Sequence, residues 1–109
     1  MKRGDVVTVA IGGDYGKPRP AVIVQTDALP ESHASIIICQ MTSVVETSRH
    51  FRVLVEPSAK NGLRVTSQIM ADKPIAINRT RIGRIIGRLS DDEMAQLDVA
   101  LAFVMGIAD

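Results

Sequence analysis

The chain is poor in aromatic residues and contains one cysteine. Aromatic residues make up 3% of its 109 residues, with no Trp, one Tyr and two Phe. The aromatic platforms on which single-stranded nucleic acids usually stack are therefore nearly absent. The single cysteine, Cys39, excludes an internal disulfide and lies in an apolar run. We interpret it as a small buried hydrophobe and expect a reducing compartment.

Long apolar runs and metal-ligand clusters are missing as well. No segment approaches the roughly 20 apolar residues of a membrane helix. The opening "MKRGDVV" is not followed by the apolar core of a signal peptide. We therefore expect a soluble, cytoplasmic protein with no membrane partner. Cys39, His33 and His50 show no metal-binding spacing, and no P-loop or dinucleotide fingerprint occurs, so no metal and no cofactor are expected.

Aliphatic side chains and an uneven distribution of charge are what the chain does have. Hydrophobic residues make up 46% of it and its net charge is +1. This favours one domain, residues 1–109, with one modest core. Residues 49–88 hold nine Lys or Arg against two carboxylates, whereas residues 89–109 hold five carboxylates and no Lys or Arg. The basic stretch favours a polyanionic partner, and the alternative is that these charges only solvate a sheet and a helix.

Short segments of β-type sequence fill most of the chain. Apolar runs and alternation predict strands over residues 5–11, 21–25, 35–41, 50–56 and 63–70. Residues 57–62 have turn chemistry, with Asn61-Gly62 suited to positive φ. Residues 72–78 are expected to form a short extended piece broken by Pro74, and residues 82–89 fit either a helix or a strand.

The last element has the clearest pattern. Ser90 and Glu93 fit a capping box, apolar residues then recur at helical spacing, and Gly106 suits a helix end. The sequence therefore predicts a helix over residues 91–105. Together these elements predict a mainly β (α+β) fold, a small antiparallel, strongly curved sheet or barrel of five to six strands with a C-terminal α-helix.

A cationic and hydroxyl-bearing set of residues is the candidate site. Arg19 lies between two prolines at the start of a predicted strand, and its fork of donors matches a phosphate. Thr42 and Ser43 end another strand and can donate to a phosphate oxygen, and Lys17 lies in the loop before Arg19. Taken alone, Arg19 is better explained as a surface arginine that pairs with a carboxylate, and Thr42 as a strand-end hydroxyl that caps a turn.

The order of these motifs resembles one known family. "KRGDVVTV", "GKPRPAVIVQ", a strand ending in "MTS" and "IGRLSDDE" are similar to the MazF/PemK/Kid toxins of bacterial toxin–antitoxin modules, which are sequence-specific endoribonucleases or mRNA interferases. The resemblance implies an SH3-like barrel, a homodimer and neutralisation by an antitoxin protein. It also implies metal-independent cleavage of single-stranded RNA, in which the 2′-OH attacks the phosphate and leaves a 2′,3′-cyclic phosphate and a 5′-OH.

The same resemblance implies roles for particular residues. Arg19 and Thr42 are the catalytic candidates. The RNA-binding candidates are Asp14, Tyr15, Lys17, Ser43, Gln68 and Asp72. Because arginine is always protonated, we assign Arg19 to the charge of the transition state and Thr42 to a non-bridging oxygen. Two departures leave the general base unassigned: Met70 stands where Kid-like members have an arginine, and Asp14-Tyr15 where they have a histidine. Asp14 and Asp72 are the two candidates for this base.

Two alternatives stay open at this point. One is a CcdB-like gyrase poison on a related fold, although Met105-Gly106-Ile107 lacks the tryptophan with which such a toxin engages gyrase. The other is an inactive member of the nuclease family that binds only RNA or an antitoxin.

Overall fold

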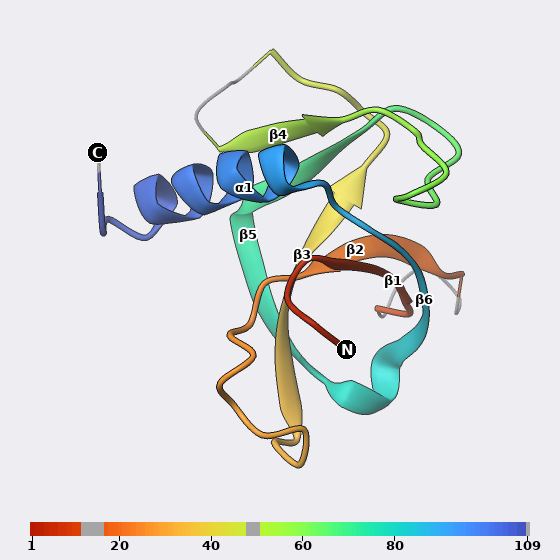
Figure 1. The fold of residues 1–109 in the computed structure, drawn as a ribbon, viewed down its shortest axis with the longest axis vertical. Coiled ribbons are helices and arrows are strands. Elements are labelled where there is room, and N and C mark those ends of the chain that lie inside the picture. The colour runs from red at the N-terminus through yellow and green to blue at the C-terminus, as the bar shows by residue number, and fades with distance from the viewer. Residues whose placement is uncertain (12–16, 48–50, 109) are drawn as a thin grey trace.

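The computed structural model describes residues 1–11, 17–47 and 51–108. The elements, in chain order, are β1 (Asp5–Val9), β2 (Arg19–Ile23), β3 (Ser35–Thr42), β4 (Arg52–Val55), β5 (Ser67–Asn78), the 3-10 turn η1 (Arg79–Arg81), β6 (Ile82–Arg88) and α1 (Asp91–Val104) (Figure 1). The expected mainly β fold with one C-terminal helix is confirmed. The ambiguous stretch at residues 82–89 is a strand, β6.

All strand pairs are antiparallel, in the order β4-β5-β3-β2-β1-β6. Within the described residues β4 and β6 are the two edge strands and do not pair with each other, so strand pairing does not close the curved sheet into a barrel. The turn that follows β4 lies against β6 instead, and the N–H of Arg88 donates to the carbonyl of Lys60 at 2.9 Å. Gly62 has φ +72°, and a Cβ there would lie 2.1 Å from the carbonyl oxygen of Ile86. This close approach requires glycine.

β5 differs from the sequence-based prediction. It is one strand of 12 residues, whereas we predicted separate pieces at residues 63–70 and 72–78. Pro74 lies inside β5, opposite Cys39, and next to a shift in the register between β3 and β5. Since proline cannot donate to the ladder, such an irregularity is a position where a strand tolerates it. Residues 63–66 lie outside the strand.

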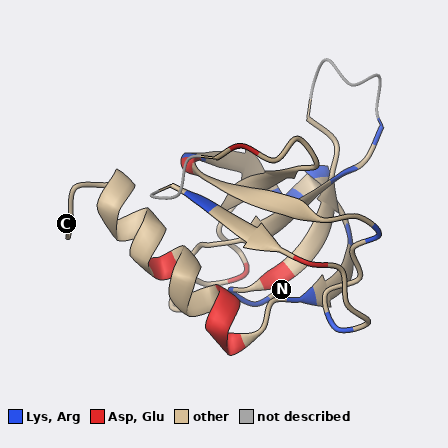
Figure 2. Cartoon of the chain, turned by 90° about the horizontal axis from the view of Figure 1, so that it is seen from above, with Lys and Arg blue, Asp and Glu red and all other residues tan. Residues whose placement is uncertain are grey.

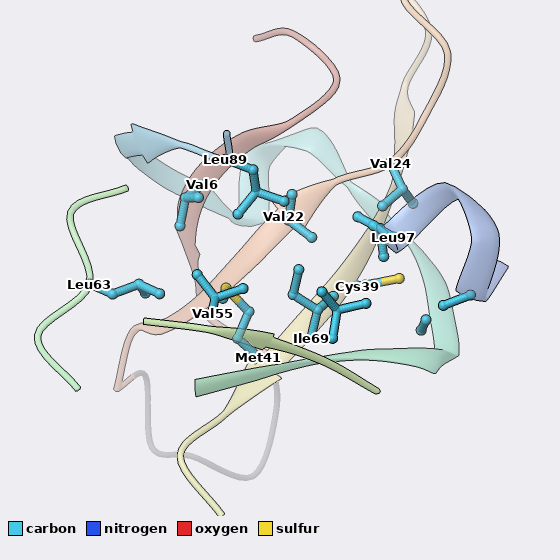
Figure 3. Close-up of a cluster of buried hydrophobic side chains, with 13 residues drawn as sticks. Val6, Val22, Val24, Cys39, Met41, Val55, Leu63, Ile69, Leu89 and Leu97 are labelled. Atoms are coloured by element: carbon cyan, nitrogen blue, oxygen red, sulfur yellow. The ribbon is translucent and has the colours of Figure 1, made fainter. Parts of the chain in front are cut away.

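The main core cluster lies between the curved sheet and α1. Figure 3 shows side chains from several strands converging there, with Leu97 reaching in from the helix. A second cluster on the other face of the sheet contains Ala21, Ile23 and Ile38. Cys39 belongs to the main cluster and is fully buried, as predicted, and this burial raises the pKa of its thiol to about 12.

The helix begins where the sequence predicts. The Ser90 side chain accepts from the N–H of Glu93 at 3.1 Å, and the Glu93 carboxylate accepts from the N–H of Ser90 at 2.8 Å. α1 ends at Val104, one residue earlier than expected, and Gly106 follows with φ +72°. The first turn is acidic and the helix carries no Lys or Arg (Figure 2). An ion pair of 2.7 Å between Arg3 and Asp98 ties α1 to the N-terminal segment.

Candidate functional site

Arg19 and Thr42 lie at the meeting ends of two neighbouring strands. Arg19 is the first residue of β2 and Thr42 is the last residue of β3. The two strands pair with Ala21 opposite Gln40. The antiparallel pairing places the start of β2 beside the end of β3, and Arg19 and Thr42 line the same hollow there. Residues 23 positions apart in sequence are therefore brought together.

A groove with a volume of about 440 Å³ forms around this pair. It is lined by Pro18, Arg19, Pro20, Gln40, Met41, Thr42, Ser43, Val44, Val65, Ser67 and Met70. We call it the Arg19 groove. Arg19 is the only charged residue among these lining residues, so the described part of the groove carries a positive charge and no carboxylate. Such a groove is suited to a phosphate.

The hydroxyl of Thr42 is held by the turn that follows β3. Its Oγ1 accepts a hydrogen bond from the N–H of Val44 at 3.1 Å. Because a hydroxyl is both acceptor and donor, this contact orients the oxygen and leaves its proton able to donate into the groove. Ser43 is exposed and also lines the groove, as the sequence predicts for a phosphate contact.

Gln68 supports the groove from inside. It lies opposite Thr42 in the register of β3 and β5, and only 3% of it is exposed. Its Oε1 accepts from the N–H of Glu46 at 2.9 Å, and its Nε2 donates to the carbonyl of Glu46 at 2.9 Å. Both halves of the amide are therefore engaged by the segment that follows Thr42. The structure adds a positioning role to this predicted RNA-binding residue.

Asp72 is engaged in an ion pair. The Nε of Arg52 donates to a carboxylate oxygen of Asp72 at 3.0 Å, and the Arg52 guanidinium also lies 5.9 Å from the ring centre of Phe51. Asp72 is not among the described residues that line the Arg19 groove. Met70, which stands where Kid-like members have an arginine, does line the groove. It lies opposite Arg52 in the register of β4 and β5.

The remaining predicted residues precede β2 in the sequence. Lys17 is exposed and precedes Pro18, which lines the groove. Asp14 and Tyr15 lie outside the described residues. Over the ranges 1–11, 17–47 and 51–108, no three His, Cys, Asp or Glu side chains gather as a metal site would require. The described helices include none with the length and apolar character needed to cross a membrane.

Sequence reasoning missed a second, larger hollow beside the groove. Its volume is about 710 Å³ and it lies between the segment after β4 and the strands β1 and β6. Arg64 and Arg84 line it, and we call it the Arg64 hollow. In the sequence, these two arginines were marked only by the excess of positive charge in residues 49–88. They come to one surface because the turn after β4 packs across β6, and sequence patterns do not predict that contact.

Comparison with known proteins agrees with this site and fold. Residues 2–105 match the family described as PemK-like, MazF-like toxins of type II toxin–antitoxin systems. The match covers nearly the whole chain, so the chain belongs to this family, and the resemblance noted from its motifs is confirmed.

Individual relatives are similar over their full lengths. A probable endoribonuclease MazF of Mycolicibacterium smegmatis is 36% identical over 109 residues, which cover 99% of each chain. Endoribonuclease MazF9 of Mycobacterium tuberculosis is 34% identical over 93% of this chain and 92% of its own. A solved mycobacterial endoribonuclease in complex with its cognate antitoxin shares the fold, with a TM-score of 0.84 at 23% identity, over 100% of this chain and 98% of that one.

Proposed function

We propose that this chain is a sequence-specific endoribonuclease toxin that cleaves single-stranded messenger RNA and thereby inhibits translation. The observation that carries the proposal is the Arg19 groove, where a strand-end arginine and a strand-end hydroxyl line one hollow whose described residues include no carboxylate. Relatives that match the chain from end to end are named as endoribonucleases.

Arg19 and Thr42 act on the phosphate of the scissile bond. The ribose 2′-oxygen attacks phosphorus, the bond from phosphorus to the 5′-oxygen breaks, and the departing 5′-oxygen takes a proton from water. A 2′,3′-cyclic phosphate and a 5′-OH remain. The guanidinium of Arg19 stabilises the negative charge that builds up on the phosphate oxygens. The hydroxyl of Thr42, oriented by the N–H of Val44, donates a hydrogen bond to a non-bridging oxygen. The reaction needs a 2′-OH, and this need selects RNA over DNA.

The proton of the attacking 2′-OH passes to a base that we do not assign to a described residue. An arginine is a poor base because its side chain stays protonated. The carboxylate of Asp72 is engaged by Arg52, and Asp72 is not among the described residues that line the Arg19 groove. Asp72 therefore serves to hold Arg52 beside Met70.

The partners follow from the family and from the charge of the chain. We propose a homodimer that acts in the cytoplasm and is neutralised by an antitoxin protein, as in the solved complex of the mycobacterial relative with its cognate antitoxin. The excess of Lys and Arg in residues 49–88 suits an acidic antitoxin segment. Its binding is expected to weaken as salt concentration rises.

The test is incubation of the purified chain with a long single-stranded RNA in EDTA, followed by mapping of the fragment ends. We expect cuts at a defined sequence that leave a cyclic phosphate and a 5′-OH, and the same cuts at a strongly reduced rate with Arg19→Ala. Intact RNA together with trapped gyrase–DNA complexes would support a gyrase poison instead. Intact RNA with no gyrase effect would indicate a member that only binds.

A further inference from the structure

We propose that Arg64 and Arg84 form a second nucleotide subsite, which binds the backbone phosphate of a nucleotide that flanks the scissile bond. This inference rests on the proposed ribonuclease function and assigns a part of its substrate to the Arg64 hollow. The ligand is one nucleotide of the same single strand whose scissile phosphate occupies the Arg19 groove.

The Arg64 hollow and the Arg19 groove adjoin one another. They share four lining residues, Pro18, Pro20, Val65 and Ser67. A strand held at Arg19 therefore has the larger hollow directly beside it. The volume of about 710 Å³ falls in the range of pockets that hold small organic ligands.

The charge of the hollow suits a phosphate. Arg64 and Arg84 both line it, and no carboxylate occurs among its described lining residues. Other arginines of residues 49–88 are occupied: Arg52 by Asp72, Arg88 by Asp5, and Arg79 by the carbonyl of His33. In the described part of the chain, no side-chain hydrogen bond or ion pair engages Arg64 or Arg84. Both side chains are exposed and available to an external anion.

The backbone beneath both arginines is fixed. The N–H of Arg84 donates to Oγ1 of Thr8 at 3.1 Å, which fastens β6 to β1 at this position. Arg64 follows the segment at Gly62 that packs against the backbone of Ile86. Two long cationic side chains therefore extend from anchored backbone positions at one hollow, and this lowers the entropic cost of closing them on a phosphate.

Apolar side chains that line the same hollow suit the rest of a nucleotide. Val65 is 56% exposed and Ile85 is 52% exposed, and both line the hollow together with Pro18 and Pro20. These surfaces can cover a base or a ribose but offer no side-chain donors or acceptors for base edges. The subsite therefore contributes affinity for the backbone and little sequence preference.

The experiment measures binding of a 2′-O-methylated single-stranded oligonucleotide, which lacks the attacking hydroxyl and stays intact. Affinity is measured between about 50 and 200 mM salt for the wild type, Arg64→Gln, Arg84→Gln and the double variant. Each lost phosphate contact is expected to reduce the salt slope by about 0.7, so the fourfold salt increase weakens binding about 2.6-fold less in each single variant. The KM for RNA cleavage is expected to rise while kcat stays unchanged, since the contact is uniform between ground and transition states.

The matched control is Lys2→Gln, which removes one positive charge from an exposed residue of a different hollow. It is expected to keep the wild-type slope. If the wild type cleaves RNA but both arginine variants bind the oligonucleotide and cleave as the wild type does, the subsite is wrong and the ribonuclease proposal stands. If the wild type neither binds nor cleaves RNA, both proposals fall. An equal loss of affinity for polyglutamate of the same length would show a surface for acidic peptides instead and would also overturn the subsite.

Discussion

Replacement of Gln68 by methionine tests how the groove is held in place. Gln68→Met keeps the length of the side chain and removes both hydrogen bonds to the backbone of Glu46, each of 2.9 Å. A hydrogen bond contributes about 0.5–1.5 kcal/mol net to stability, so two contribute about 1–3 kcal/mol. Because Glu46 is exposed, water can replace the lost partners, and we expect the lower half of that range.

The variant is also expected to cleave RNA more slowly while remaining folded. Thr42 lies opposite Gln68, and Ser43 and Val44 belong to the segment that leads to Glu46 and line the groove. Without the two hydrogen bonds from Gln68 to the backbone of Glu46, this segment no longer holds the Thr42 hydroxyl at a fixed position. The reduced activity should therefore appear in kcat more than in KM.

Urea unfolding and a cleavage time course measure the two effects separately. Gln96→Met on the exposed face of α1 is the control, and it is expected to change the free energy of unfolding by less than about 0.5 kcal/mol. If Gln68→Met unfolds at the wild-type urea concentration and cleaves at the wild-type rate, Gln68 does not position the groove.

Three further predictions concern the fold. Gly62→Ala should destabilise the chain by more than about 1 kcal/mol in urea unfolding, because φ is +72° and the new Cβ would meet the carbonyl of Ile86; wild-type stability would refute this contact. Ser90→Ala should cost about 1 kcal/mol through loss of the helix cap, with no change expected at the neighbouring exposed Asp91→Ala beyond a few tenths. Cys39 should react with iodoacetamide only after unfolding, because its pKa is raised to about 12. Above pH 9 the unfolded thiol ionises while the folded one stays protonated, so stability should fall toward pH 12, and Cys39→Ala should lose that part of the slope.

Local sequence patterns correctly predicted the elements that short-range signals specify. The strands near residues 5–11, 21–25 and 35–41 follow from β-branched apolar runs, and the helix follows from its capping box. β5 was predicted wrongly because Pro74 argues against a strand unless an irregularity accommodates it, and that irregularity depends on pairing with β3. Leu63 has the apolar character of a strand residue, yet it packs into the core from a turn.

The site residues that belong to a recognisable motif could be predicted from the sequence, whereas the contacts that depend on tertiary packing could not. Arg19 and Thr42 came from the resemblance, but their position across a strand pair depends on a register that the motifs do not contain. The partner of Asp72 comes from β4 and the partner of Gln68 from the segment after β3. The Arg64 hollow forms only when the turn after β4 packs against β6, and no local sequence pattern predicts that contact.

The central claim is that Arg19 and Thr42 act on the same phosphate, and a double-mutant cycle on RNA cleavage tests it most directly. Arg19→Ala and Thr42→Val should each lower kcat by about 10²- to 10³-fold, as loss of a donor to a developing oxyanion does. Because the two groups act as a unit, the double variant should be about as slow as the slower single variant. Losses that multiply in the double variant, or wild-type cleavage by Arg19→Ala, would contradict the account.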